Sequence, residues 1–411
     1  MKKTLAFFAV LVYFLTAQAQ KKNFSYQFYG FVRGDLFYNT RANQAPVDGN
    51  FYLYPLDKDL DDNGKDINAT PNGSFYTFTT RLGVDMQGPK VGKAETSAKV
   101  EMDFGGFSSS TTMLRIRQAY VKLDWKRVGV LIGQTWHPLF GKVVPDVLNL
   151  STGAPFQPFN REPQIAVSYR SGAWEWTGAA LWQLQYTSSG PNGSSESYLK
   201  NSCVPEIYVG ADYRNPSWTA GIGFHLISLK PRTSSAVVDE AGNEHRYRVN
   251  ERMTTCSWEG HVQYQSCKWR VAAKTMLASC LDHTALLGGY GISGIDPVTG
   301  EREYTPFRHS TSWINLTCGN RWKIHLYAGY TKNLGSTKPL VSGEKYGVGL
   351  DIDQLCSGNV AFSYNLPHWQ FGVEYVPSTA WYGQTDLSDG KVVHTHTVTN
   401  HRVLGLMIYY F

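Results

Sequence analysis

The sequence lacks any run of about 18 consecutive apolar residues, the shortest length that crosses a bilayer as a helix. Insertion into a membrane would therefore have to use strands. The one clear apolar run, Leu5 to Leu15, is shorter. It follows two lysines and precedes a small-x-small sequence at 17–19, which is the order of a secretory signal peptide and its cleavage site. We expect residues 1–19 to be removed and the exported chain to begin at Gln20.

The sequence also lacks an excess of either charge. When the two signal lysines are removed from the 39 basic residues, 37 remain against 33 acidic ones. This balance does not indicate a nucleic-acid binder. Catalytic motifs such as GxSxG and HExxH are missing too. We therefore predict no enzymatic activity, no cofactor and no metal site.

The six cysteines form no CxxC pair, which argues against a zinc site. Cys267 and Cys318 fall at predicted turns of neighbouring hairpins, and Cys256 and Cys280 lie across one predicted hairpin. In an exported protein these cysteines could therefore form disulfides. Six free thiols are the alternative.

Aromatic residues are abundant, at 14% of the chain, with 25 Tyr and 12 Trp. From Ser25 onward, residue type alternates with a period of two over segments of about 10 residues, the length of a tilted membrane strand. In the segment 94–104 one face carries Ala94, Ala98, Val100, Met102 and Phe104. Lys99, Glu101 and Asp103 share the other face. A dry core would not accept that charge density, so this face must be wet. A tyrosine-rich extracellular sandwich is the alternative.

The connections between the segments alternate between long and short. We predict an all-β fold: a closed antiparallel transmembrane β-barrel of about 16 strands, with long extracellular loops and short periplasmic turns. A short segment, 20–24, precedes the barrel, which occupies 25–411. No boundary indicates a second domain.

One long connection, 138–164, separates the hairpin 115–136 from the next strand. It is rich in Pro, Gly and Phe and is unusually long for a structureless loop, so we predict that this third loop folds into the lumen and constricts it. Phe140 would help it pack against the wall. An ordinary outer loop that covers the barrel mouth is the alternative. The residues predicted to act in the constriction are Lys142, Asp146, Phe156, Phe159 and Arg161.

Basic side chains on the inward phase are predicted to line the pore: Arg33, Arg81, Lys99, Arg115, Arg117, Arg270, Lys274, Arg321 and Lys323. Acidic residues share that phase, so the alternative is that many of these side chains form ion pairs that stiffen the wall. Near Arg117 to Ala119 the alternation slips by one residue, which predicts a bulge.

The C-terminal strand ends on Tyr409, Tyr410 and Phe411. A terminal aromatic residue resembles the signal by which outer-membrane barrels are recognised for assembly, so Tyr409 and Phe411 are the predicted assembly signal. We expect the outer membrane of a Gram-negative bacterium as the location, with membrane lipids and the barrel-assembly machinery as partners.

The sequence RIRQAYVKLDW at 115–125, GQTWHPLF at 133–140 and STGAPFQPFNREPQI at 151–165 resemble trimeric outer-membrane porins of the DcaP type and, more distantly, phosphate-selective porins. The similarity is strongest over Phe78 to Tyr169. It implies a homotrimer whose channels favour anionic solutes such as dicarboxylates. Some members carry a helical extension before the barrel, but here only about five residues separate the predicted cleavage site from the first strand.

We therefore expect a porin that allows passive diffusion of small hydrophilic, anionic solutes. A closed, non-conducting barrel that binds or adheres to a partner through its long outer loops is the alternative.

Overall fold

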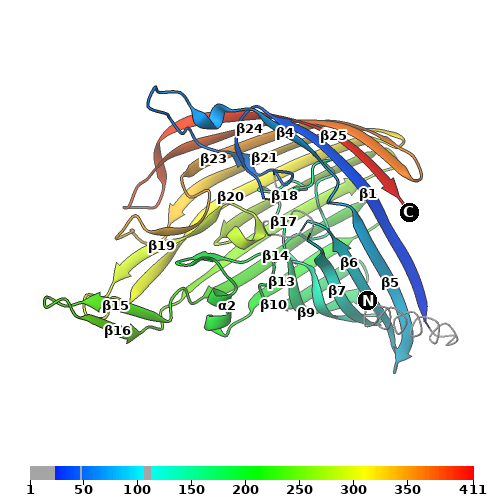
Figure 1. Cartoon of the computed structure of the whole chain (residues 1–411). Helices are drawn as coiled ribbons and strands as arrows, with labels where there is room; N and C mark the ends of the chain where they lie inside the picture. Colours follow the sequence, from blue (N-terminus) through cyan, green and yellow to red (C-terminus); the bar gives the residue numbers. More distant parts are fainter. Residues whose placement is uncertain (1–23, 47–48, 106–112) are drawn as a thin grey trace, which may run out of the picture.

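The computed structural model describes residues 24–46, 49–105 and 113–411. The predicted signal peptide and the predicted start at Gln20 lie outside this part. Sixteen antiparallel strands form a closed barrel, as predicted, with β25 pairing back onto β1 (Figure 1). In chain order the barrel strands are β1 (Ser25–Asn39), β5 (Arg81–Val91), β6 (Ala94–Asp103), β7 (Arg115–Trp125), β8 (Val128–Trp136), β9 (Arg161–Ser171), β10 (Trp174–Leu181), β13 (Glu206–Arg214), β14 (Trp218–Leu229), β17 (Met253–Gln265), β18 (Trp269–Ser279), β20 (Arg302–Gly319), β21 (Trp322–Ser336), β23 (Ile352–Asn365), β24 (Trp369–Thr385) and β25 (Val392–Tyr410).

The shorter elements belong to the connections at one end of the barrel, which we call the loop end. The hairpin of β15 and β16 projects beyond the barrel there (Figure 1). These elements are β2 (Asn43–Gln44), β3 (Tyr54–Pro55), η1 (Ile67–Ala69), β4 (Asn72–Tyr76), β11 (Ser189–Gly190), β12 (Gly193–Ser194), α2 (Ser197–Ser202), β15 (Ser234–Val238), β16 (Glu244–Arg248), η2 (Asp282–Thr284), β19 (Gly288–Ile295) and β22 (Lys345–Val348).

Among the described residues, no helix combines the length and the apolar character that a membrane span requires.

The opposite end, the turn end, carries connections of two or three residues, such as Lys126 and Arg127 between β7 and β8. Five barrel strands begin there with an exposed tryptophan directly after a turn: Trp174, Trp218, Trp269, Trp322 and Trp369. Trp322 packs against Tyr364 with ring centroids 4.4 Å apart, and Trp369 against Tyr409 at 4.7 Å. This ring of aromatic side chains is the arrangement of a membrane interface.

The outer face of the barrel wall is apolar. Along β1, Val32, Leu36 and Tyr38 are exposed, whereas the alternating residues Asp35 and Phe37 are buried inside. The same alternation continues around the barrel and leaves a band of exposed aliphatic side chains. Members of this band include Ile116, Ile132, Val167, Val209, Ile222, Ile314, Ile324, Val360, Val373 and Met407. The period of two therefore separates a lipid-facing surface from a polar interior.

The C-terminal residue closes the barrel. The Phe411 N–H donates to the Gly30 carbonyl at 3.1 Å, and the Gly30 N–H donates to the Phe411 carbonyl at 3.2 Å. A side chain at Gly30 would meet the Arg81 carbonyl at 2.4 Å and the Phe411 ring at 2.7 Å. Only glycine fits there without moving β5 or the C-terminus.

Strand lengths differ around the barrel. The barrel strands from β5 to β13 have 8 to 11 residues, whereas β20 to β25 include strands of 18 and 19 (Figure 1). The hairpin of β24 and β25 therefore extends through most of the connection expected at 377–392. Similarly, the strand expected over 76–86 is interrupted after β4, and β5 begins only at Arg81. All six cysteines are described and all are free.

Two loops fill the lumen. The predicted third loop crosses it between β8 and β9, and the first outer loop also turns inward, which the sequence did not indicate. Phe51 of that outer loop packs against Phe159 with ring centroids 4.7 Å apart, and the Tyr382 hydroxyl donates to the Pro55 carbonyl at 2.8 Å. Phe51, Leu53 and Phe159 belong to the largest buried apolar cluster of the molecule.

Candidate functional site

The constriction loop comprises residues 137–160 and lies inside the barrel. It ends before the expected Gln164, because residues 161–164 already pair with β8 as the first part of β9. Its tip reaches strands far from its own hairpin: the Tyr327 hydroxyl of β21 donates to the Gly153 carbonyl at 3.0 Å, and the Trp313 indole N–H of β20 donates to the Gln157 side chain at 2.9 Å. The loop thus spans the lumen.

Three of the predicted pore-lining residues bind the backbone of this loop. Lys274 of β18 is 2% exposed, and its ammonium group donates to the carbonyls of Leu139 at 2.8 Å and Phe140 at 3.1 Å. Arg270 donates to the Val144 carbonyl, and Arg33 to the Leu148 carbonyl at 2.8 Å. We call Arg33, Arg270 and Lys274 the loop anchors.

Acidic groups of the wall complete the attachment. Glu374 of β24 is fully buried and accepts from the Leu148 N–H at 2.7 Å and from the Asn149 side chain at 2.6 Å. In the opposite sense, Lys142 of the loop forms ion pairs with Glu175 at 2.8 Å and Asp212 at 3.0 Å on β10 and β13. Lys142 is therefore a wall contact.

Asp146 lies in the loop opposite β20 and β21. Its backbone N–H donates to the Asn315 side chain at 2.9 Å, and its carboxylate lies 3.5 Å from Nδ1 of His325. Burial alone would raise the pKa of the Asp146 carboxyl, but His325, Lys323 and Arg270 together lower it below its usual value. The group therefore keeps its negative charge in the lumen.

The aromatic residues of the loop form its packed base. Phe156 fits against Gly329 of β21, where a Cβ would meet the ring at 2.4 Å, and Phe159 packs edge-on against Trp136 at 5.0 Å. Arg161 is the first residue of β9 and is fully buried; its guanidinium lies 4.8 Å from the centre of the Trp136 ring. Its Nη2 donates to the Tyr186 hydroxyl at 2.9 Å. Arg161 thus supports the base of the loop.

A second set of inward basic residues forms ion pairs across β5, β6 and β7. Arg115 pairs with Asp103 at 2.8 Å, and Arg117 pairs with both Asp103 and Glu101 at 2.9 Å. We call Arg81, Arg115 and Arg117 the arginine ladder; Arg81 joins it 3.8 Å from Glu101.

Lys99 lies next to the ladder and pairs with Asp85 at 3.1 Å.

The predicted bulge lies at Arg117. Glu101 of β6 is opposite Gln118, and Met102 is opposite Ile116, so Arg117 has no partner in the register. Because of this extra residue, Ile116 and Val121 both face outward although they are five positions apart. The bulge places the Arg117 guanidinium beside both carboxylates, as bulges often do near functional sites.

Two cavities lie along this wall. The one nearer the loop end has a volume of about 280 Å³ and is lined by residues that include Arg115 and Arg117. The one nearer the turn end has about 330 Å³ and is lined by residues that include Arg33, Arg81 and Arg117. The linings share Arg117, Leu150 and Phe159, so these three side chains border both cavities.

The remaining predicted residues lie elsewhere. Arg321 is in the turn between β20 and β21, where its guanidinium lies 5.0 Å from the centre of the Tyr364 ring; it is not on a strand face. Lys323 is on β21, near Asp146. Tyr409 and Phe411 are exposed at the turn end. Their part in assembly, like solute passage along the basic residues, stays a prediction.

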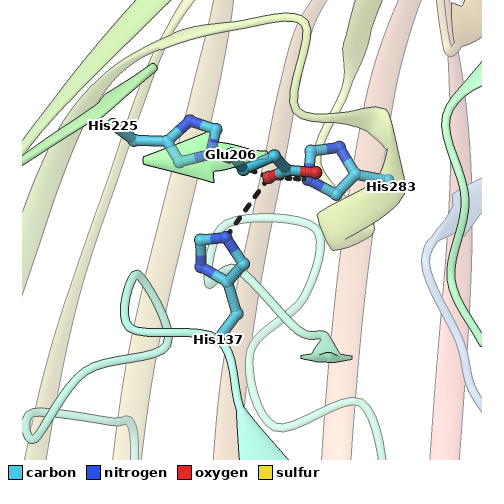
Figure 2. Close-up of side chains that lie close together, drawn as sticks. All are labelled: His137, Glu206, His225 and His283. Atoms are coloured by element: carbon cyan, nitrogen blue, oxygen red, sulfur yellow. Dashed lines mark hydrogen bonds and ion pairs between the residues drawn. The ribbon is translucent and has the colours of Figure 1, made fainter. Parts of the chain in front are cut away.

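The sequence did not indicate a cluster of three histidines and one glutamate on the inner wall. Figure 2 shows His137, His225 and His283 turned toward the Glu206 carboxylate. Their side chains are 0% exposed, and Nε2 of His225 lies 2.8 Å from Oε2 of Glu206. These residues come from the loop, β13, β14 and η2, so no spacing in the sequence could reveal them.

Neither a family model nor a curated protein matches this chain. Among solved structures, it is similar to the outer membrane channel DcaP of Acinetobacter baumannii, with a TM-score of 0.65, 18% identity and coverage of 95% of this chain and 99% of that one. It is also similar to the trimer form of OmpT of Vibrio cholerae (TM-score 0.54, 12% identity, 95% and 100% covered). A third match is OmpF of Salmonella typhi in complex with daunomycin (TM-score 0.51, 10% identity, 94% and 97% covered). The chain therefore has the β-barrel fold of these outer-membrane proteins, DcaP among them.

Proposed function

We propose that this chain is an outer-membrane porin that passes small hydrophilic solutes by passive diffusion and favours anions. The observation that carries the proposal is the pair of cavities that share Arg117, Leu150 and Phe159 as lining residues. One lies toward the loop end and the other toward the turn end. In this proposal the two cavities together form a route past the constriction loop.

The charges along this route support anion preference. Arg33, Arg81, Arg115 and Arg117 line the cavities, whereas their carboxylate partners Asp35, Glu101 and Asp103 are not among the lining residues. The side chain of Arg81 is 22% exposed, against 6% for Glu101. At Arg81 and Arg115 a passing solute would therefore meet the guanidinium group before its carboxylate partner. Charges at close range in a pore bias which ions pass.

The location and assembly follow from the same proposal. The chain would reach the outer membrane of a Gram-negative bacterium after signal-directed export, and Phe411 would present the assembly signal to the barrel-assembly machinery. A homotrimer is supported by the fold shared with the trimeric form of OmpT. The trimer would have to form through the barrel walls.

Planar-bilayer recording tests the proposal. The purified mature chain, added in detergent, should produce stable current steps that occur in groups of three for a trimer, while detergent alone should produce none. Persistent silence from correctly folded protein would contradict it.

One observation favours a second function. Because Phe51 and Leu53 of the first outer loop are buried in the same cluster as the constriction loop, the lumen is more filled than a simple channel requires. A closed barrel that binds a partner through its outer loops would share this feature. Silence in the bilayer would support that function.

A further inference from the structure

We propose that His225, His283 and Glu206 form a binding site for a divalent transition metal of the Zn²⁺ class. Oε2 of Glu206 lies 2.8 Å from Nε2 of His225, 3.1 Å from Nε2 of His283 and 3.5 Å from Nε2 of His137. The four ligand atoms all lie within 4.8 Å of one another. Figure 2 shows the three rings converging on the carboxylate.

The geometry is close to what such an ion needs. Zinc takes nitrogen and oxygen ligands at about 2.0–2.2 Å in a tetrahedron, which separates neighbouring ligand atoms by about 3.3 Å. The separations of Glu206 from the two ligand histidines, 2.8 Å and 3.1 Å, are slightly shorter than that value, so a small outward displacement of the carboxylate makes room for the ion. Imidazole ligands favour Zn²⁺, Cu²⁺, Ni²⁺ or Co²⁺ over Ca²⁺ or Mg²⁺, which prefer oxygen.

The charge at the site also favours a cation. Glu162 of β9 lies beside the cluster, with its carboxylate 3.9 Å from His137 and His283. The side chains of Glu162 and Glu206 are both 0% exposed, and within the part of the chain that the structure describes their ion-pair partners are all histidines. Two buried carboxylates are costly without a compensating charge, and one divalent ion supplies it.

His137 has a different role from the other two histidines. Its Nδ1 accepts the Leu139 N–H at 3.1 Å, which leaves the ring proton on Nε2, pointing toward Glu206. Nδ1 of His225 and of His283 has no hydrogen-bond partner among the described residues, so these rings can carry their proton there and offer the Nε2 lone pair. His137 is therefore a positioning residue for the Glu206 carboxylate, and water completes the coordination.

A cavity gives access to the site, and a bound ion would link the elements around it. His283 and Asp282 line the cavity of about 280 Å³ nearer the loop end, which gives an ion a path to the cluster. A bound ion would join η2 to β13 and β14 at the point where the constriction loop leaves β8. It would stabilise that base and would not take part in chemistry.

Metal binding by the whole mature chain tests the proposal, independently of any conductance. Protein made without a histidine tag would be folded in detergent, stripped with a chelator and dialysed against Zn²⁺. We expect about one Zn²⁺ per chain. Glu206→Gln and His225→Gln should weaken binding by more than tenfold, and His137→Gln by about tenfold, as for the loss of a group that orients a ligand. His309→Gln, which removes another buried histidine, is the matched control and should bind as the wild type does.

Heat-modifiable mobility on gels shows whether each variant folds. If one does not, the absorption spectrum of the Co²⁺-loaded wild type tests the proposal instead. Intense bands of four-coordinate Co²⁺ that vanish on addition of excess Zn²⁺ are the expected result. Weak six-coordinate bands, or Zn²⁺ uptake that is equal in the wild type and in folded His225→Gln and Glu206→Gln proteins, would overturn the proposal.

Discussion

The basic side chains on the two sides of the lumen have different binding partners and different roles. On β5 and β7 the arginine ladder pairs with carboxylates of β6 and lines the two cavities. On β18, Lys274 and Arg270 donate to carbonyls of the constriction loop. The basic groups of one wall therefore pair with neighbouring carboxylates beside the cavities, and those of the other wall hold the loop.

The difference shows that inward charge alone does not define a pore lining. Lys274 is 2% exposed, and both of its carbonyl partners belong to the loop. Hydrogen bonds to a charged group contribute about 1.5–3 kcal/mol each, so this lysine is important for loop position. The ladder arginines instead pair with carboxylates of the wall and line the two cavities.

The largest effect is expected when the β18 side chains that hold the constriction loop are removed. In a Lys274→Met, Arg270→Met variant the loop carbonyls lose their donors, so the loop should leave the wall. We expect a several-fold larger and noisier single-channel conductance, together with faster trypsin cleavage at Lys142. Lys323→Met removes an inward lysine without touching these bonds and should leave the loop in place, with trypsin cleavage as slow as in the wild type. Wild-type conductance with an uncleaved loop would show that the anchors do not hold it.

The second prediction tests the ladder. Replacing Arg115 and Arg117 by glutamine leaves Glu101 and Asp103 without their main counter-charges. The anion-to-cation permeability ratio, measured from reversal potentials, should therefore fall several-fold, with a smaller change in conductance. The Arg115→Lys, Arg117→Lys variant keeps both charges and should retain the preference. An unchanged ratio in the glutamine variant would remove the ladder from the selectivity mechanism.

The smallest effect is expected from Asp146, the acidic residue that the constriction loop contributes to the lumen. Asp146 lines the cavity nearer the turn end, and its lowered pKa keeps it charged at neutral pH. Asp146→Asn should raise the anion preference modestly at pH 7. In the wild type the same rise should appear only when the pH falls below about 4, the ordinary range of an aspartate. If the anion-to-cation permeability ratio of the wild type did not change with pH, this would argue against a role for Asp146.

Much of the fold could be predicted because the alternation of apolar and polar residues along a strand is a local property of the sequence. The strands predicted at 115–125 and 128–136 match β7 and β8, and the slip in alternation marked the bulge at Arg117 to within three residues. The inward phase also placed Lys274 and Arg115 correctly on the inner side of the barrel.

The function of each inward residue could not be predicted in the same way. Alternation tells which face a side chain occupies, but not what crosses the lumen in front of it. Lys274 and Arg117 share a phase, yet one faces the loop backbone and the other a cavity. The inward turn of Phe51 and the convergence of His137 and His283 on Glu206 depend on segments that are distant in the sequence and meet only in the folded barrel.

The reversal potential of the wild-type protein in a salt gradient is the most direct test of the account. With potassium chloride at unequal concentrations across the bilayer, arginine side chains that face the passage should give a potential whose sign reports chloride crossing more easily than potassium. A potential of the opposite sign would contradict the assignment of the ladder to the passage, and an absence of current would contradict the channel itself.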